Sequence, residues 1–474
     1  MNEFFTLMRS ELLVTALIFI VLFMKIFSKE DEQMAPDNSR LMAVVNLLLA
    51  VVVALGFFGG GKGLLFGGMF MSTGLLTLEK NILAFGTLVV SLTACPWLRN
   101  HRHAHEFYML LLATLLGMFF MISSDNLLMF YLGLELSTIP LAALVNFDLD
   151  RKRSAEAAMK MIMMSAFSSG LLLFGISLLY GSTGTLSLTL LPMLLDGSPL
   201  QLLAFVMIIS GFGFKISAVP FHLWTADVYE GAPAPVTAYL SVVSKSAVLF
   251  AMLPVLYRSF GPLADDWYQL LAILAILTMI VGNLFAMRQD NLKRLLAFSS
   301  IAQVGFILVG MTGQSPEGAA SVIFFLLIYL FSNLGAFAVL TLVSTATGKE
   351  TIHDYRGFHK SNPLLAWILA ISLFSLAGIP PVAGFFGKFF LLLAGAGQAN
   401  YPLVIVASLN MIISLYYYLR VIKAMFMDPN DHPVPAIQSG AMPKLAMAIC
   451  LGGMLVTGLY SGAYEYIFSL FTVR

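Results

Sequence analysis

The chain has 474 residues, of which 59% are hydrophobic and only 11% are charged, and its mean hydropathy is +0.89. Too few polar residues remain to cover the surface of a soluble domain of this length, so the composition excludes an ordinary soluble protein. The net charge of +1 neither favours nor excludes a nucleic-acid partner; the apolar composition, which places the chain in a lipid bilayer, argues against one. The two cysteines, Cys95 and Cys450, form no disulfide or metal-ligand pattern, so no metal or other cofactor is expected in this chain.

Apolar stretches long enough to cross a bilayer recur from one end of the chain to the other. Their continuity is typical of helices and not of the short alternating strands of a membrane β-barrel. We therefore expect an all-α polytopic membrane protein with about 14 transmembrane helices. The expected spans are 12–28, 41–58, 76–97, 107–123, 126–146, 157–180, 199–219, 234–257, 268–287, 295–313, 318–346, 363–397, 402–427 and 444–468.

Two segments need a separate interpretation: the first span, and a polar stretch that follows the seventh. The first span follows Arg9 and Glu11 and lacks a small-residue cleavage site after it, so we expect a retained helix and not a removed signal peptide. The segment 221–231 is too polar to span the bilayer and is expected to lie as a short amphipathic piece after the seventh span.

The basic residues fall unevenly on the two sides that this model of spans defines. One side takes 17 of them: Lys25, Lys29, Arg40, Arg99, Arg102, Arg151, Lys152, Arg153, Arg288, Lys293, Arg294, Lys349, Arg356, Lys360, Arg420, Lys423 and Lys444. The opposite side takes five: Arg9, Lys62, Lys80, Arg258 and Arg474. Basic loops stay on the cytoplasmic side, so both termini are predicted to be non-cytoplasmic.

Proline interrupts two of the expected spans. Pro220 ends the seventh, and the pair Pro380-Pro381 lies inside the twelfth. Proline removes a backbone donor and clashes with the preceding turn, so both helices should break. Broken backbone at membrane depth is tolerated only where it is buried in protein or lines a wet cavity. Interrupted helices at matching places in two halves are a known pointer to the transport site of inverted-repeat transporters.

The spacing of the breaks predicts the domain organisation. Each break falls in the fourth span of a group of five, and an odd number of spans forces two repeats into opposite orientations. We predict an N-terminal three-helix segment, a first repeat of spans 4–8, an inverted second repeat of spans 9–13, and a C-terminal helix. Their boundaries are 1–104, 105–260, 261–430 and 431–474.

Five ionisable residues lie inside otherwise apolar segments: Glu135, Lys160, Lys215, Lys245 and Lys388. A charge in hydrocarbon costs about 2.5 to 3.5 kcal/mol even on lenient scales, so such residues normally face a wet or paired interior and serve a charge pathway. Burial disfavours the charged form of both side chains, and a nearby opposite charge favours it. A glutamate and a lysine can therefore hold or release a proton according to their separation, which indicates a proton-handling path.

Each of these residues also has a structural reading. Glu135 could be an inert, hydrogen-bonded packing residue. Lys215 and Lys388 could each bind carbonyl groups freed by the neighbouring break. Lys245 lies mid-span, where snorkelling cannot easily bring its ammonium to water, and it shares a helical face with Ser241 and Ser244.

Two further candidates lie nearer the cytoplasmic side or the first break. Lys160 is one turn from Glu156, so a plain interfacial ion pair explains it as well as a relay role does. His222 follows the break at Pro220; it could carry protons between pathway lysines, since the reference pKa of histidine is about 6.5. An interfacial structural histidine accounts for it equally well.

Three motifs give the chain a family resemblance. They are FKISAVPFHLWTADVYEGAPAPVTAYLSVVSKSA at 214–247, DNLKRLLAFSS at 290–300 and IPPVAGFFGK at 379–388. Together they resemble the antiporter-like membrane subunits L, M and N of proton-pumping NADH–quinone oxidoreductase, respiratory complex I. The resemblance covers about residues 105–427. The stretch DVYEGAP and the lysine at 388 favour the subunit N branch, and the chain ends without the long lateral helix that marks subunit L.

The resemblance implies roles for the candidate residues. Glu135 and Lys215 form the coupled pair of one half-channel, Lys245 is the central relay, and Lys388 leads toward the far side. Lys160 matches a family lysine in the sixth span. The resemblance also implies partners: other membrane-arm subunits, including related antiporter-like subunits, with NADH, FMN, Fe–S clusters and quinone bound elsewhere in the complex. Plant and cyanobacterial counterparts that accept electrons from ferredoxin share these motifs, so the electron donor stays open.

The expected function is proton translocation by a non-redox subunit of NADH:quinone oxidoreductase, driven by electron transfer in its partners. The alternative is a subunit of a multisubunit cation/proton antiporter, which would exchange ions without a redox partner. A structural spacer would tolerate neutral replacement of the buried lysines. A small-solute transporter would need more polar groups around its cavity than these spans provide.

Overall fold

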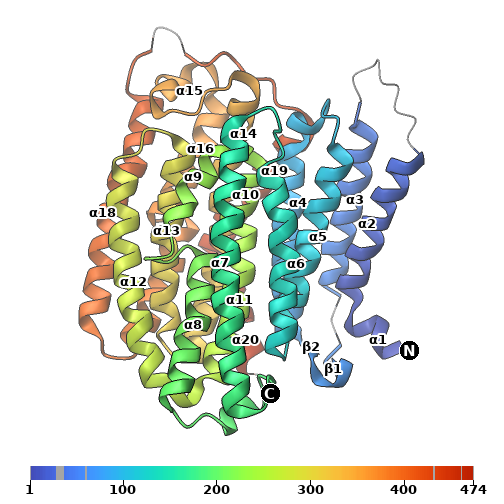
Figure 1. Ribbon diagram of the computed structural model, residues 1–474. Coiled ribbons are helices and arrows are strands. Elements are labelled where there is room, and N and C mark those ends of the chain that lie inside the picture. Colours follow the sequence, from blue (N-terminus) through green and yellow to red (C-terminus); the bar gives the residue numbers. More distant parts are fainter. Residues whose placement is uncertain (1, 28–36, 59–60, 431–432, 461, 473–474) are drawn as a thin grey trace.

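Long apolar helices run side by side through most of the chain (Figure 1). The computed structural model describes residues 2–27, 37–58, 61–430, 433–460 and 462–472. The first helices are α1 Asn2–Leu7, α2 Arg9–Phe27, α3 Ser39–Gly56, α4 Gly74–Leu98, α5 Ala104–Ile122, α6 Leu127–Val145, α7 Lys152–Thr183, α8 Pro199–Ile216, α9 Leu223–Gly231 and α10 Ala234–Tyr239. Next come α11 Lys245–Pro254, α12 Ala264–Met287, α13 Leu292–Met311, α14 Pro316–Thr347, α15 Phe358–Ser361, α16 Pro363–Ala377, α17 Ala383–Ala396, α18 Tyr401–Phe426, α19 Ala441–Leu459 and α20 Gly462–Thr472.

The all-α polytopic fold expected from hydropathy is confirmed. Within the described residues, 13 helical segments are long and apolar enough to cross a membrane, and α16 and α17 are shorter apolar helices. These two occupy the expected twelfth span, so the broken span and the 13 others correspond to the expected set. The short helix α9 occupies the segment expected to be too polar to span.

Side-chain oxygens begin several of these helices. Asn126 Oδ1 accepts from Leu128 N at the start of α6, and Asn291 Oδ1 accepts from Lys293 N at the start of α13. Such caps satisfy backbone N–H groups that have no partner within the helix. The capping residues therefore fix where α6 and α13 begin, and these two helices carry residues of the candidate site.

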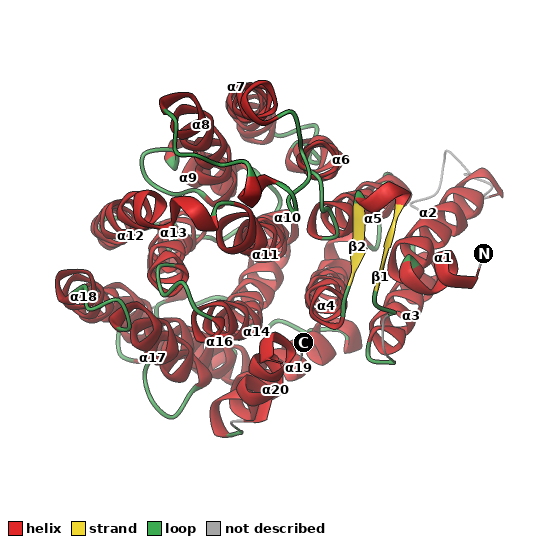
Figure 2. Cartoon of the chain, turned by 90° about the horizontal axis from the view of Figure 1, so that it is seen from below, coloured by secondary structure: helices red, strands yellow, loops and turns green. Residues whose placement is uncertain are grey.

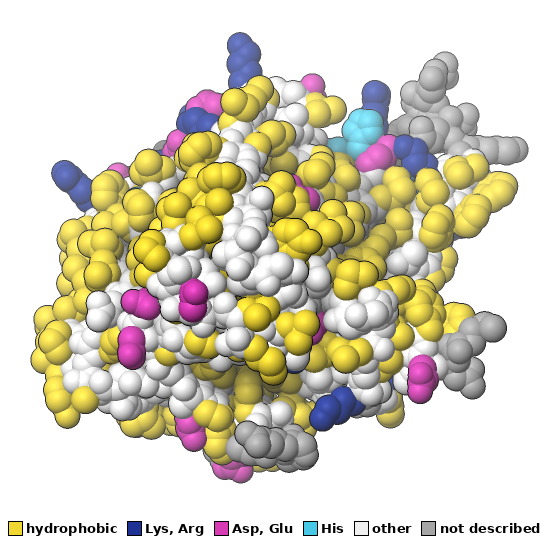
Figure 3. Space-filling model, turned by 60° about the horizontal axis from the view of Figure 1, so that its bottom comes forward, with side chains coloured by type: hydrophobic (Ala, Val, Ile, Leu, Met, Phe, Trp, Pro, Cys, Tyr) yellow, Lys and Arg dark blue, Asp and Glu magenta, His cyan; other side chains and the backbone are white. Residues whose placement is uncertain are grey.

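The core lies where α13, α14 and the segment Ala234–Ser259 pack together, because nearly every residue of these three is buried. Figure 2 shows α11 and α14 near the middle of the bundle, with α7, α8, α12 and α18 toward the outside. Few residues of α2 are buried within the chain, as expected of a helix that faces lipid or another subunit. Hydrophobic side chains are also spread across the whole of the face seen in Figure 3.

Both predicted breaks are present and have the same local geometry. Helix α8 ends at Ser217, with φ 64°, and α16 ends at Gly378, with φ 85°. The N–H of Ala218 bonds Gly213 O, and the N–H of Ile379 bonds Phe374 O. These are the hydrogen bonds of Schellman motifs, which satisfy carbonyls at a helix end. Each break is therefore a regular helix C-terminus within the bundle, with its last carbonyl groups hydrogen-bonded.

The eighth span contains irregular turns that hydropathy did not indicate. Residues Leu240–Ser244 (η3) and Val255–Ser259 (η4) form π-helical turns on either side of α11. A π-helical turn inserts one residue into the helix and often marks a functional position. The first one ends immediately before Lys245. Four short 3₁₀ turns complete the elements: η1 Phe66–Gly68, η2 Leu191–Met193, η5 Gly261–Leu263 and η6 Ile352–Tyr355.

A small β-hairpin was also not predicted. Strands β1 Gly63–Leu65 and β2 Phe70–Ser72 pair antiparallel, with Gly63 opposite Ser72. The hairpin lies at the same end of the bundle as both ends of the described chain (Figure 1). An even number of spans places the two termini together in this way. Of the residues used for the charge bias, Lys29 and Arg474 lie outside the described residues.

Candidate functional site

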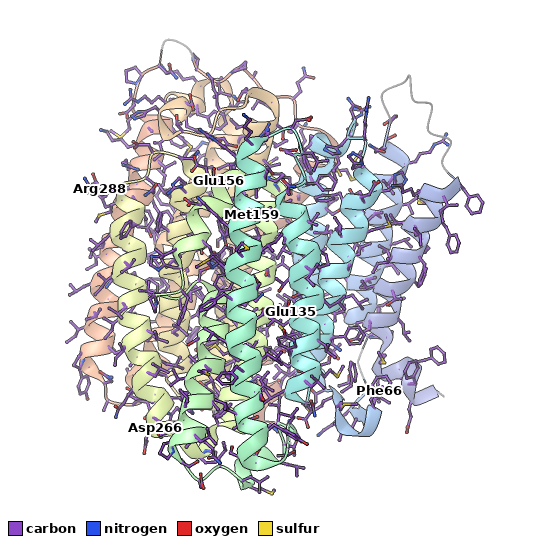
Figure 4. All side chains as sticks on the ribbon, in the orientation of Figure 1. Phe66, Glu135, Glu156, Met159, Asp266 and Arg288 are labelled. Atoms are coloured by element: carbon purple, nitrogen blue, oxygen red, sulfur yellow. The ribbon has the colours of Figure 1, made fainter. Side chains whose placement is uncertain are left out.

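Glu135 and Lys215 face the same strip of hydroxyl groups. Glu135 lies on α6 near mid-height of the bundle (Figure 4), and its Oε1 accepts a hydrogen bond from Ser169 Oγ at 2.5 Å. Lys215 Nζ, from the last turn of α8, donates to Thr138 Oγ1 at 2.7 Å and Ser165 Oγ at 2.8 Å. No ion pair joins the two within the described part of the chain. The two residues of the pair implied by the resemblance therefore bind different hydroxyls.

The regular geometry of two helices places these hydroxyls close to one another. Glu135 and Thr138 are three residues apart on α6, and Ser165 and Ser169 are four apart on α7, so each pair shares one helical face. Pro140 lies in α6 just beyond them and removes one backbone hydrogen bond of that helix. The acid and the lysine thus sit one helix turn apart along a polar strip, close enough for each charge to act on the other.

Lys245 begins α11 directly after the first π-helical turn and is 2% exposed. Its Nζ donates to Ser300 Oγ on α13 at 2.8 Å and lies 5.5 Å from the ring centroid of Tyr229. The sequence placed Ser241 beside Lys245, but the Ser241 hydroxyl donates to Ala238 O instead. The partner of Lys245 comes from the second half of the chain and could not be read from its own helix.

A second group of hydrogen bonds continues from Ser299, the neighbour of Ser300. The hydroxyls of Ser299 and Tyr418 are 2.5 Å apart, and Gln303 Nε2 donates to Tyr418 Oη at 3.1 Å. Gln303 Nε2 also donates to Leu376 O at 3.0 Å. Ser299, Gln303 and Tyr418 are all at most 2% exposed. This buried group links α13 to α18 and to the last turn of α16.

Lys388, beside the second break, contacts the end of that group. Its side chain is 1% exposed, and its Nζ donates to Leu376 O at 2.8 Å and Ala377 O at 3.3 Å. Leu376 O therefore accepts from both Gln303 and Lys388. The geometry matches the structural reading in which a lysine binds carbonyls at the end of the broken helix. It also joins Lys388 through one oxygen atom to the polar group beside Lys245.

Lys160 belongs to a different environment. Its side chain is 41% exposed, and its Nζ lies 2.7 Å from Glu156 Oε1 and 2.8 Å from Asp227 Oδ2. Asp227 on α9 also receives Arg294 from α13 at 2.8 Å. Burial alone would raise the pKa of Asp227, but hydrogen bonds from Lys160 and Arg294 outweigh it and lower that pKa. The expected ion pair between Lys160 and Glu156 is present. Asp227 also connects Lys160, in the first half of the chain, to Arg294 in the second, which was not predicted.

His222 lies between the broken halves, as the N-cap residue of α9. Its ring is half-buried, and Nδ1 has no hydrogen-bond partner within the described residues. Among the described residues, no hydrogen bond connects His222, Lys215 and Lys245. The first and central lysines are therefore separated by a gap that only water or side-chain movement could bridge.

Two further lysines, which the sequence places in loops or at span ends, are buried in the structure. Lys80 on α4 is 3% exposed, and its Nζ lies 2.6 Å from Glu11 Oε1 on α2. Lys293 is 2% exposed and lies 2.9 Å from Glu350 Oε1. Lysines near span ends are usually solvated, and nothing local reveals an acid on a distant helix.

Comparisons with known proteins agree with this architecture. Residues 124–414 match the family model described as "NADH:quinone oxidoreductase/Mrp antiporter, TM". The chain is 43% identical over 464 residues to a protein of Phocaeicola vulgatus named NADH-quinone oxidoreductase subunit N, covering 97% of each. It is 37% identical to a protein of the same name from Rhodospirillum rubrum, covering 95% of this chain and 92% of that one.

Solved structures show the same fold. A chain of respiratory complex I from Thermus thermophilus is 28% identical, with a TM-score of 0.80, covering 96% of this chain and 97% of that chain. A chain of the Mrp complex from Dietzia superposes with a TM-score of 0.81 at 20% identity, covering 98% and 99%. The second likeness bears on the fold alone.

Proposed function

This chain belongs to the family of NADH:quinone oxidoreductase and Mrp antiporter membrane subunits, and we propose from that premise that it is the proton-translocating subunit N of a complex I. It is a multi-pass membrane protein, and its relatives named subunit N match it over nearly their full length. The proposal assigns this chain the transfer of protons across the membrane while its partners transfer electrons.

The observation that carries the proposal is the buried polar path between Lys245 and Lys388. Lys245 bonds Ser300, and the adjoining Ser299 begins the group that reaches Lys388 through Tyr418, Gln303 and Leu376 O. Hydroxyl, amide and carbonyl groups in succession can orient the water that a proton would follow. A spacer has no need of two lysines buried in this way, because burying such groups costs stability.

The arrangement around Glu135 suggests how the path is driven. Glu135 and Lys215 are held on the same hydroxyl strip without direct contact. A shift that brings them together favours both charged forms, and a shift that separates them favours release of a proton by Lys215. Electron transfer in the partner subunits would supply that shift, and a proton would pass by way of His222 to Lys245 and then to Lys388.

Lys160 is assigned to the entrance of the path. Its ammonium is partly exposed and lies between Glu156 and Asp227, at the end of α7 that carries the basic loops. This cluster would gather protons from the cytoplasmic side and pass them toward Lys215. The order from Lys160 to Lys388 then follows the direction expected for outward pumping.

The proposal includes the surroundings of the chain. Other membrane-arm subunits, among them related antiporter-like subunits, would cover its exposed apolar faces. NADH, FMN, Fe–S clusters and quinone would be bound by partner subunits, and this chain would perform no redox catalysis. The complex would lie in a bacterial inner membrane, with both termini of this chain on the non-cytoplasmic side and repeats at 105–260 and 261–430.

Glu135→Gln tests the proposal in the assembled complex. Vesicles driven by NADH and quinone should pump protons with a severalfold lower initial rate, because the neutral amide cannot stabilise the charged form of Lys215. Glu317→Gln, at an exposed glutamate of α14, is the control. Assembly is checked on a native gel. Full pumping at the normal ratio to electron flow would make Glu135 a packing residue and would bring the spacer reading forward.

A further inference from the structure

A cavity outside the proposed proton path lies at the end of the bundle opposite the basic loops. Its volume is about 530 Å³, which falls in the range of small-molecule sites. Its lining comes from the ends of several elements: Leu76 on α4, Trp267 on α12, Ala319 on α14 and Phe471 on α20. These side chains are apolar, and they lie where helices end and a bilayer meets water.

One carboxyl group in this lining has no partner. Glu79 on α4 is 2% exposed, and its Oε2 makes no hydrogen bond within the described residues. The neighbouring Lys80 is already paired with Glu11 at 2.6 Å. A buried carboxylate without a partner is costly, so the site requires either a proton on Glu79 or a cationic donor in the cavity.

A positive group lines the same cavity. Arg258 Nη1 lies 3.1 Å from Asp125 Oδ1, and its Nη2 donates to Thr189 Oγ1 at 2.7 Å, which holds the guanidinium in place. The side chain remains 42% exposed. A guanidinium carries five N–H donors, so these contacts leave donors for an oxyanion. The cavity thus offers a single occupant the Glu79 carboxyl group, the Arg258 guanidinium and an apolar wall.

We propose that this cavity binds a phospholipid with a primary ammonium headgroup, a phosphatidylethanolamine. Its ammonium would donate to Glu79, its phosphate would accept from Arg258, and an acyl chain would lie along Leu76, Trp267 and Phe471. Phosphatidylcholine would fit less well because its quaternary ammonium has no N–H to donate. An anionic phospholipid without an amine would leave Glu79 unpartnered. Charge complementarity and the position at the helix ends select this lipid class.

The test uses photoactivatable phosphatidylethanolamine and phosphatidylcholine with identical acyl chains, added to the purified, detergent-washed complex. Cross-linked peptides that contain Leu76 or Phe471 report on the cavity alone. In the wild type, labelling of these peptides by phosphatidylethanolamine should exceed labelling by phosphatidylcholine about tenfold, the effect of one charge-assisted hydrogen bond. Glu79→Gln should abolish the preference. Asp266→Asn, at an exposed acid of the same end of the bundle (Figure 4), should keep it.

Equal labelling of the wild-type cavity by the two lipids would overturn the proposal, as would an undiminished preference in Glu79→Gln. The wild-type complex alone remains decisive if Glu79→Gln fails to assemble. Stepwise N-methylation of the headgroup should then lower labelling progressively, with the largest loss when the last N–H disappears. A series with no trend would show that the cavity holds hydrocarbon without recognising an amine.

Discussion

The lysines of the central path bind neutral oxygen atoms. Lys215 contacts two hydroxyls, Lys245 one hydroxyl, and Lys388 two carbonyls. Lys80 and Lys293, in contrast, lie within 3 Å of a carboxylate. A direct ion pair holds the charged form of a lysine, whereas a dipolar partner leaves less difference between the charged and neutral forms. Among the buried lysines, the contacts therefore separate those suited to exchanging protons from those that hold helices together; Lys160, at 41% exposure, is not one of the buried set.

Tyr418 allows the path to be tested at a single oxygen atom. Tyr418→Phe removes the hydroxyl that links Ser299 to Gln303. Tyr257→Phe is the control, since its hydroxyl donates to Met311 O at 2.7 Å, away from the path. Each variant loses about 1 kcal/mol of hydrogen bonding. Only Tyr418→Phe should lower proton pumping, by severalfold, in vesicles with verified assembly. Similar pumping by the two variants would remove Tyr418 from the path.

At the scale of elements, the second break depends on close backbone contact. A Cβ on Gly384 of α17 would lie 1.7 Å from Ser375 O on α16. Gly384→Ala should destabilise the folded chain by about 1–3 kcal/mol, the usual cost of overpacking, and reduce the amount of assembled complex. Gly452→Ala, where nothing lies within 4 Å of the new methyl group, is the control. Thermal denaturation in detergent measures the difference; equal midpoints would contradict this account of the break.

The cluster that joins α7, α9 and α13 should make stability depend on pH. Lys160 and Arg294 lower the pKa of Asp227 in the folded state. Its stabilising effect is therefore fully present above the unfolded value, about 3.9, and is lost as pH falls through the lower folded value. Asp227→Asn should lower the midpoint of thermal unfolding at pH 7.

The difference between Asp227→Asn and the wild type should then narrow as pH falls from about 4 through the lower folded pKa of Asp227, below which both side chains are neutral. Asp265→Asn, at an exposed acid of α12, provides the control and should show little difference at either pH. If the midpoint of thermal unfolding of Asp227→Asn stays below that of the wild type by the same amount at every pH, the variant has lost packing and not ion pairing.

The elements that could be predicted from the sequence are those whose signal lies within a short stretch of chain. Hydropathy over 18 or more residues locates the spans, and proline with glycine locates the breaks at Pro220 and Pro380, because both signals are local. The π-helical turn before Lys245 has no such signal in its composition. The hairpin at 63–72 is too short and too rich in glycine to show the alternation of a strand.

At the scale of the whole molecule, the lysines could be found but their partners could not. A lysine in an apolar run stands out by itself. Ser300, Tyr418 and Asp227 become partners only through the rotation and packing of helices far apart in the sequence. The same limit hid the Glu11–Lys80 pair. Sequence reasoning thus identified which residues carry charge, and the tertiary structure showed how they are connected.

The proposed path would use both halves of the molecule. Lys245 from the first half binds Ser300 of the second, and Lys388 shares the acceptor Leu376 O with Gln303 of α13. Loss of either lysine should therefore interrupt transfer through the whole chain, although each sits in a different half. An arrangement of two independent half-channels would instead leave one of them working.

The most direct test is the number of protons pumped per NADH oxidised by vesicles that carry Lys245→Ala or Lys388→Ala in the assembled complex. Lys62→Ala, at an exposed lysine, is the control for loss of charge. We expect both variants at buried lysines to pump fewer protons per NADH, by a similar amount, and Lys62→Ala to match the wild type. An unchanged ratio in both buried-lysine variants would contradict the relay and leave this chain a structural part of the membrane arm.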